Sequence, residues 1–179
     1  MIFTRKSVTK YSNLGIKING KILNMDKVKF LGLIFDSRLT WKEHIQHLVS
    51  KSKAKINLLR SLTGQKWGAG KRSLLTIYRT LIRSRLDYGC QILYTASKHL
   101  LKQLDTIQHT CLRICCGAMK STPIHALQQE CGEMPLSLRR HKLQLQYAVK
   151  LQASRNNLAK SIIANTWETM VGLRRVQNL

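Results

Sequence analysis

Residues 28–45 read VKFLGLIFDSRLTWKEHI, and within this stretch the pattern changes from that of a strand to that of a helix. Residues 28–35 form an apolar run with Lys29 near its start, which is typical of a β-strand. Thr40 and Glu43 then have the spacing of a capping box, which predicts that a helix begins here. The stretch therefore predicts a change from β to α structure near residue 38.

The sequence before this stretch is also strand-like. Residues 2–4 are a short β-type run, and residues 16–18 and 21–23 flank the dipeptide Asn19-Gly20. Asn-Gly is a strong signal for a two-residue hairpin turn, because both turn positions need positive φ. We therefore expect a short antiparallel β piece, made of one hairpin plus one or two further strands.

Helical periodicity dominates the rest of the chain. It predicts helices from residue 41 to 62, from about 71, from about 97 to 116, from 123 to about 132, and from about 135 to 153, with a weaker helix from residue 156. The expected inward-facing residues of the first three are Trp41, Ile45, Leu48, Val49, Ile56, Leu59, Leu62, Leu74, Leu75, Tyr78, Leu81, Ile82, Leu100, Leu101, Leu104, Ile107, Cys111, Ile114 and Cys115. The predicted fold class is α+β, mostly α, with a bundle of four to six helices. The expected division is 1–38, 39–153 and 154–179.

The charge balance indicates the kind of partner. Lys and Arg number 31 and Asp and Glu number 8, for a formal net charge of +23. Self-repulsion at this level favours a polyanionic partner, with nucleic acid as the first candidate and an anionic membrane surface as the second. The basic residues are spread along the chain rather than gathered in a tail, so a folded basic surface is expected.

Other features point to an intracellular protein, nuclear or cytoplasmic. No apolar stretch is long enough for a transmembrane helix, and the first residues lack the apolar core of a signal peptide. The five cysteines give no disulfide framework. The spacing of Cys111, Cys115, His125 and Cys131 permits a zinc site, but two of these cysteines lie on an apolar helical stripe, so we expect core residues and no metal or cofactor.

Five further motifs follow in order. They are LLTIYR at 74–79, LDYG at 86–89, LDTIQ at 104–108, TPIHAL at 122–127 and PLSLRR at 135–140. Together with residues 28–45, they resemble the end of the palm and the thumb in reverse transcriptases of non-LTR retrotransposons, in particular the jockey-like group. The resemblance covers roughly residues 1–153.

The resemblance implies a role for each part. Residues 2–35 would be the last palm strands, and Phe30, Leu31 and Gly32 would match the turn-and-strand element that holds the primer end. A glycine lets nucleic-acid backbone approach closely, although a glycine bulge in a buried strand explains Gly32 equally well. The helices would match the thumb, which grips the template–primer duplex, an RNA–DNA or DNA duplex, with little sequence preference.

The catalytic part of such an enzyme is missing from this sequence. Polymerases of this family hold two Mg²⁺ ions on adjacent aspartates, and this sequence has no Asp-Asp pair. The resemblance therefore implies a fragment with no catalytic residues, inactive alone, whose parent enzyme is an RNA-directed DNA polymerase and whose protein partner is the remainder of the polyprotein. The alternative is an independent basic helical DNA- or RNA-binding protein without polymerase ancestry.

Three groups of basic residues are candidate phosphate contacts. Arg72, Arg79 and Arg83 fall on one helical stripe, which Lys71 and Arg85 extend, and a solvated outer face is the alternative. Lys51, Lys53 and Lys55 are candidates in the first helix, where they point to two sides, so at most part of the group can face one duplex.

Arg139 and Arg140 form the third group. Positive charge at the start of a helix is disfavoured by the helix dipole, which suggests an anionic partner. That partner is either nucleic acid or one of Glu130 and Glu133. Among the aromatic residues, Trp67 is the candidate for stacking on bases, whereas Trp41 is expected in the core.

Overall fold

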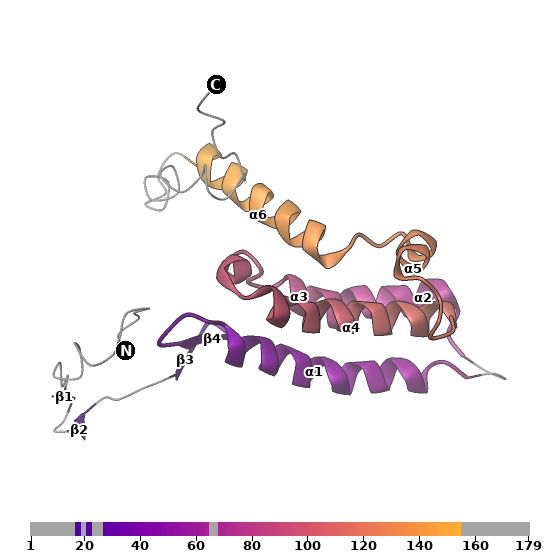
Figure 1. Ribbon diagram of the computed structural model, residues 1–179, viewed down its shortest axis with the longest axis horizontal. Coiled ribbons are helices and arrows are strands. Elements are labelled where there is room, and N and C mark those ends of the chain that lie inside the picture. Colours follow the sequence, from indigo (N-terminus) through magenta and orange to yellow (C-terminus); the bar gives the residue numbers. More distant parts are fainter. Residues whose placement is uncertain (1–16, 19–20, 23–26, 65–67, 155–179) are drawn as a thin grey trace.

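The computed structural model describes residues 17–18, 21–22, 27–64 and 68–154. Its fold is mostly α, with two short antiparallel hairpins before a group of packed helices (Figure 1). The expected fold class is therefore confirmed. The predicted strand at residues 2–4 and the predicted tail helix from residue 156 lie outside the described residues. None of the helices in the described part has the length and apolar content needed to span a bilayer.

The two hairpins account for the β structure. Strands β1 (Lys17–Ile18) and β2 (Lys21–Ile22) pair antiparallel on either side of Asn19-Gly20, as the dipeptide predicts. Strands β3 (Lys27–Phe30) and β4 (Leu33–Asp36) form a second hairpin. The expectation of one continuous strand over residues 28–35 was wrong. A turn at Leu31-Gly32, where both residues have positive φ, divides the run in two.

A long helix with an irregular middle follows α1 (Lys42–Ser61). It consists of α2 (Lys71–Ile77), the π-helical segment η2 (Tyr78–Arg83) and α3 (Ser84–Asp87). Tyr78 and Ile82 are buried as expected, but Leu81 is 36% exposed, so its predicted core position was wrong. In an α-helix, a residue three positions after Tyr78 lies on nearly the same face. The wider π turn places Leu81 further round the helix from Tyr78, so Leu81 leaves the inner face.

The remaining helices close the core. A 3₁₀ turn, η3 (Ile92–Thr95), leads into α4 (Lys98–Cys116), which is capped by the Ser97 side chain and ended by Gly117 at φ 60°. Helix α5 (Ile124–Cys131) follows Pro123, which caps the helix rather than forming its first residue as predicted, and Gly132 ends it. Helix α6 (Leu136–Ala153) completes the described chain.

The core lies between α1, the 71–87 helix and α4, and α1 runs alongside α4 (Figure 1). Helix α5 crosses one end of this group, and α6 extends away from it. The most deeply buried large side chains are Ile45, Leu59, Tyr78, Ile82, Leu93, Leu104 and Leu112.

Candidate nucleic-acid interface

The turn of the second hairpin presents apolar side chains to solvent. Phe30 is 61% exposed and Leu31 is 72% exposed, next to Gly32 at the tip. Leu31 and Gly32 have φ of 46° and 82°, the backbone signs of the two-residue turns that match strand twist. Gly32 is thus neither a bulge nor buried, and the positive φ explains the glycine. A leucine at positive φ is uncommon. Leu31 in this position places an apolar side chain at the exposed tip of the hairpin.

The LDYG motif holds this turn against the helices. The Tyr88 hydroxyl donates to the Leu31 carbonyl at 2.5 Å. Gly89 has φ 67°, and a Cβ at that position would lie 2.6 Å from Leu33 Cδ2. The two residues after the 71–87 helix therefore fix both the tip of the hairpin and its β4 strand.

A second set of contacts joins the hairpin to α1. The Ile34 amide donates to His44 Nδ1 at 3.4 Å. Burial lowers the pKa of His44, and nearby His47 lowers it further, so the ring is held neutral and accepts this bond. Lys27 pairs with Glu43 at 2.9 Å. The hairpin therefore has a fixed position at the start of α1.

The Asp36 side chain caps the turn that precedes α1, and the predicted capping box is not formed. The Asp36 carboxylate accepts from the Thr40 amide at 2.8 Å and from the Trp41 amide at 3.0 Å. Burial raises the pKa of Asp36, but these hydrogen bonds outweigh it and lower the pKa below its ordinary value. The Thr40 side chain makes no N-cap hydrogen bond of the predicted kind, because Trp41 takes the N-cap position at φ 63°.

Trp41 is a core residue, as predicted. It is 4% exposed, its Nε1 donates to Thr95 Oγ1 at 2.8 Å, and its ring meets Phe35 edge-on with centroids 5.2 Å apart. It thereby links the hairpin, α1 and the turn before α4. Trp67, the candidate for base stacking, lies outside the described residues.

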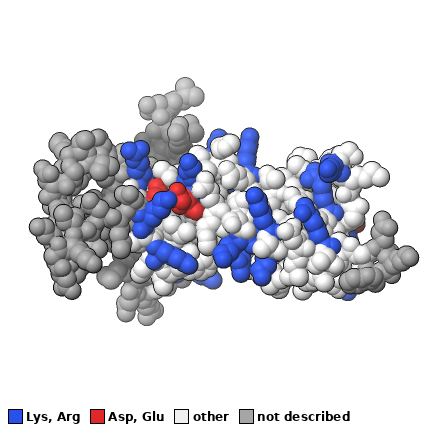
Figure 2. Space-filling model, turned by 90° about the horizontal axis from the view of Figure 1, so that it is seen from below, with Lys and Arg blue, Asp and Glu red and all other residues white. Residues whose placement is uncertain are grey.

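Basic side chains cover the face of the molecule to which α1 contributes. Figure 2 shows Lys and Arg spread along this face, with acidic atoms gathered mainly in one small group. Lys51 is exposed and Lys55 is partly exposed. Neither takes part in the ion pairs found among the described residues.

The arginines of the 71–87 helix are placed differently from one another. Arg79 Nε lies 2.6 Å from Glu133 Oε1, and Arg83 Nη1 lies 2.8 Å from Glu133 Oε2. The Glu133 side chain is 2% exposed, so these two arginines cover a buried carboxylate rather than form a free stripe. Lys71 pairs with Glu130. Arg72 is exposed and is absent from the ion pairs of the described chain.

The arginines at the start of α6 also have carboxylate partners. Arg139 makes a two-pronged contact with Asp87 at 2.6 to 2.9 Å, which raises the arginine pKa. Arg140 reaches Asp105 at 3.3 Å. The prediction that Glu130 or Glu133 pairs with these arginines was wrong, because both carboxylates form ion pairs with basic residues of the 71–87 helix. Asp87, from the LDYG motif, thus anchors α6.

The cysteines are mostly core residues. Cys90, Cys111, Cys115 and Cys131 are buried, and Cys116 Sγ lies 2.9 Å from Cys131 Sγ. Burial raises the pKa of Cys111 and Cys115 to about 12. Within the described ranges, no cluster of three or more His, Cys, Asp or Glu side chains is placed to hold a metal ion.

Sequence reasoning missed a basic groove between α1 and α4. Arg60 and Lys53 of α1, Arg113 of α4 and Lys120 of the following loop line it. These residues come from three separate segments, so no local motif marks them.

Comparison with known proteins finds relatives of this chain among retrotransposon polymerases. The chain is similar to RNA-directed DNA polymerases of non-LTR retrotransposons, which confirms the resemblance drawn from the motifs.

Three of these relatives come from insects. The chain is 26% identical over 137 residues to the probable RNA-directed DNA polymerase from transposon X-element of Drosophila melanogaster, a match over 75% of this chain and 15% of that protein. It is 27% identical over 127 residues to the Pol polyprotein from type-1 retrotransposable element R1 4 of Nasonia vitripennis, a match over 70% of this chain and 32% of that protein. It is 22% identical over 149 residues to the RNA-directed DNA polymerase from mobile element jockey of Drosophila melanogaster, a match over 83% of this chain and 16% of that protein.

The chain therefore spans about a third or less of the length of these curated relatives. No protein-family model matches it, and no solved structure matches it.

Proposed function

We propose that this chain is the palm edge and thumb of a non-LTR retrotransposon reverse transcriptase and that it binds the template–primer duplex. Residues 1–38 are the palm-edge part, 39–153 the thumb and 154–179 a C-terminal tail. The observation that carries the proposal is the exposed apolar turn of the β3–β4 hairpin, held by Tyr88 and Gly89 directly before a basic helix. RNA-directed DNA polymerisation belongs to the intact parent enzyme, with its Mg²⁺ and the rest of its polyprotein.

The hairpin suits contact with the end of a duplex. Phe30 and Leu31 offer apolar surface for a terminal base pair or sugar, and Tyr88 prevents the tip from folding back. Along α1, Lys51 and Lys55 add positive charge on the same helix that the hairpin precedes. The described helices do not place a set of Arg and Asn side chains for reading bases in a groove, so we expect contact with backbone and little sequence preference.

The test separates binding from folding. Leu31→Asn creates an Asn-Gly turn, the best sequence for this backbone, and removes the apolar side chain. We expect the variant to fold as well as the unmodified chain and to bind a blunt RNA–DNA hybrid about threefold to tenfold more weakly, by the loss of about 1 kcal/mol of apolar contact. Fluorescence anisotropy with a labelled hybrid measures the affinity.

Leu138→Asn is the matched control, because Leu138 is 56% exposed on α6, outside the proposed interface. Equal affinities for the two variants would remove the hairpin from the interface. A labelled-nucleotide assay with Mg²⁺ should show no primer extension by this chain, and heat-sensitive incorporation would contradict the predicted inactivity.

A further inference from the structure

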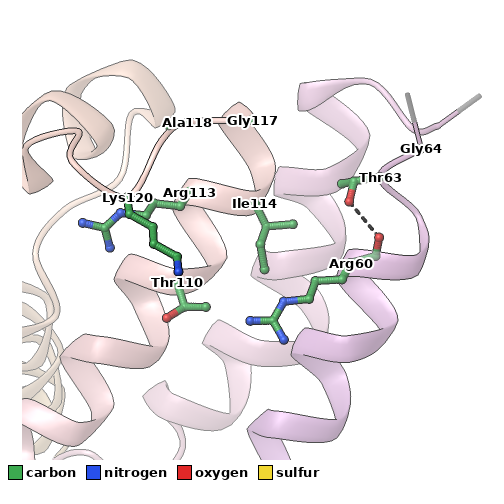
Figure 3. A pocket seen from close by; sticks show the side chains of 9 residues that line it. All are labelled: Arg60, Thr63, Gly64, Thr110, Arg113, Ile114, Gly117, Ala118 and Lys120. Atoms are coloured by element: carbon green, nitrogen blue, oxygen red, sulfur yellow. Dashed lines mark hydrogen bonds between the residues drawn. The ribbon is translucent and has the colours of Figure 1, made fainter. Parts of the chain in front are cut away.

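The groove between α1 and α4 consists of two adjoining hollows of about 790 Å³ and 510 Å³. Both hollows include Arg60 and Thr110 in their walls, so they form one continuous feature. In Figure 3, Arg60 from α1 and Lys120 from the loop after α4 extend toward Thr110 from opposite sides of the larger hollow.

The walls of this groove carry positive charge only. Lys53, Arg60, Arg113 and Lys120 line it, and neither hollow has a carboxylate among its lining residues. The carboxylates of the described chain are engaged elsewhere: Asp36 caps the turn before α1, and Glu43, Asp87, Asp105, Glu130 and Glu133 form ion pairs with other cations. Positive charges that converge without a counter-charge repel one another, so the groove favours an anionic occupant.

Helix dipoles account for only part of this arrangement. Arg60 and Arg113 lie in the last turns of α1 and α4, where positive charge is favoured. Lys53 lies in the middle of α1, and Lys120 lies outside the helices. The Arg113 guanidinium donates to the Thr122 carbonyl at 3.4 Å and thereby holds the loop that carries Lys120. The loop is thus fixed in a position where its lysine faces Arg60.

The dimensions of the groove fit a nucleic-acid strand. Lys53 and Arg60 are seven residues apart on α1, or about 10 Å at 1.5 Å per residue. One strand of duplex DNA carries a phosphate about every 3.4 Å of helix axis, so this wall covers about three phosphates. The residues that line the two hollows include no aromatic side chain for base stacking. Contact with the sugar–phosphate backbone is therefore favoured over contact with bases.

We propose that this groove binds the sugar–phosphate backbone of one nucleic-acid strand, with Arg60 and Lys120 as its main phosphate contacts. The proposal rests on the proposed function and adds a second contact region, toward the far end of α1 from the hairpin. The strand is gripped near the end of α1 while the hairpin meets the duplex end. No residue of this groove coincides with the apolar turn, so the two regions can be tested separately.

The test compares two double variants that each lose two positive charges. Arg60→Gln with Lys120→Gln removes two positive charges from the groove, and the control, Lys98→Gln with Lys142→Gln, removes two from exposed positions elsewhere, so the variants match in charge although only the first loses an arginine. Affinity for a double-stranded DNA is measured by anisotropy over a series of salt concentrations. Each lost phosphate contact makes the slope of log affinity against log salt shallower by about 0.9, so the groove variant should lose about 1.8 and the control far less.

Each outcome decides one question. Equal slopes for the two double variants would overturn the groove and leave the proposed function standing. Absence of duplex binding by the unmodified chain would overturn the proposed function itself. If the groove double variant shows a lower urea midpoint than the unmodified chain, the single Lys120→Gln change replaces it, with Lys142→Gln as its control and an expected difference in slope of about 0.9.

Discussion

Two arginines of the 71–87 helix, Arg79 and Arg83, and the two arginines at the start of α6 face carboxylates, whereas those at the far ends of α1 and α4 face none. Arg79, Arg83, Arg139 and Arg140 pair with Glu133, Asp87 or Asp105. Arg60 and Arg113 line a groove whose walls carry no carboxylate. We therefore expect two roles for the basic residues of this chain of net charge +23, one in holding the fold and one in binding a partner.

The few carboxylates decide which role an arginine has. Glu133 is buried and needs a compensating charge, so the two partly exposed arginines nearest to it are held against its carboxylate. Cations far from any carboxylate keep their charge available to solvent or to a polyanion. The paired region should therefore respond to substitution in stability, and the unpaired region should respond in nucleic-acid binding.

The largest expected effect follows from breaking the paired region. Replacing Arg79 and Arg83 together by Met leaves Glu133 buried without a partner, which should cost about 3 kcal/mol of unfolding free energy. Urea denaturation followed by circular dichroism measures it. The Arg72→Met variant on the same helix should stay within about 0.5 kcal/mol of the unmodified chain.

A third variant separates the ion pair from packing. Adding Glu133→Gln to the double Met variant removes the uncompensated charge and should recover part of the lost stability. If the double variant unfolds at the same urea concentration as the unmodified chain, the paired arginines do not stabilise the fold, and the comparison fails on that side.

The next effect concerns the join between hairpin and helices. Gly89→Ala places a Cβ at φ 67° and 2.6 Å from Leu33 Cδ2, whereas Gly117→Ala at φ 60° meets nothing within 4 Å. The left-handed backbone alone costs about 1 kcal/mol, so Gly117→Ala should lose about that much and Gly89→Ala about 2 kcal/mol. Urea midpoints give the difference, and equal losses would show that Leu33 moves aside freely.

The pH dependence of stability should report the hydrogen bonds by which Asp36 caps the turn before α1, an effect of about 1 kcal/mol. Hydrogen bonds from Thr40 and Trp41 lower the pKa of Asp36 in the folded chain despite its partial burial. A lowered folded pKa means that the contribution is present above the unfolded pKa of about 3.9 and is lost as pH falls through the folded value.

Thermal unfolding between pH 6 and pH 2 of the unmodified chain and of Asp36→Ala measures this cap. The two curves should converge as the solution becomes more acidic. A constant gap between them across this range would mean that the cap does not depend on the charge of Asp36.

Local signals in the sequence predicted most of the fold. Asn19-Gly20 marks the first hairpin, and Gly117 and Gly132 end α4 and α5, because each acts on its own neighbours. The hydrophobic pattern missed the turn of the second hairpin, which only the resemblance implied, because Leu31 places an apolar residue at a position of positive φ. The π-helical segment has no signature in the hydrophobic pattern either, and only packing reveals it.

The candidate site was less accessible to sequence reasoning. The resemblance singled out Phe30, Leu31 and Gly32, and the structure places Phe30 and Leu31 at an exposed turn, whereas their contact with the primer end stays a prediction. The partners of Arg79 and Arg139 lie more than fifty residues away along the chain, so the periodicity of the helix alone suggested a free basic stripe. A basic stripe in sequence therefore identifies where charge lies, and the folded carboxylates identify which charge remains available.

The smallest effect distinguishes the two kinds of arginine on one helix. Arg72 is exposed, lies seven residues before Arg79 and forms no ion pair within the described chain, whereas Arg79 pairs with Glu133. Arg72→Gln should leave the urea midpoint unchanged and, if Arg72 meets one phosphate, make the salt slope of duplex binding shallower by about 0.9. Arg79→Gln should instead lower the midpoint, since it weakens the cover of Glu133, and change the slope little.

Anisotropy titrations of both single variants at several salt concentrations measure the slopes. The opposite result, a shallower slope for Arg79→Gln alone, would mean that duplex phosphate displaces Glu133 from this arginine, and the division between paired and available cations would not hold on this helix.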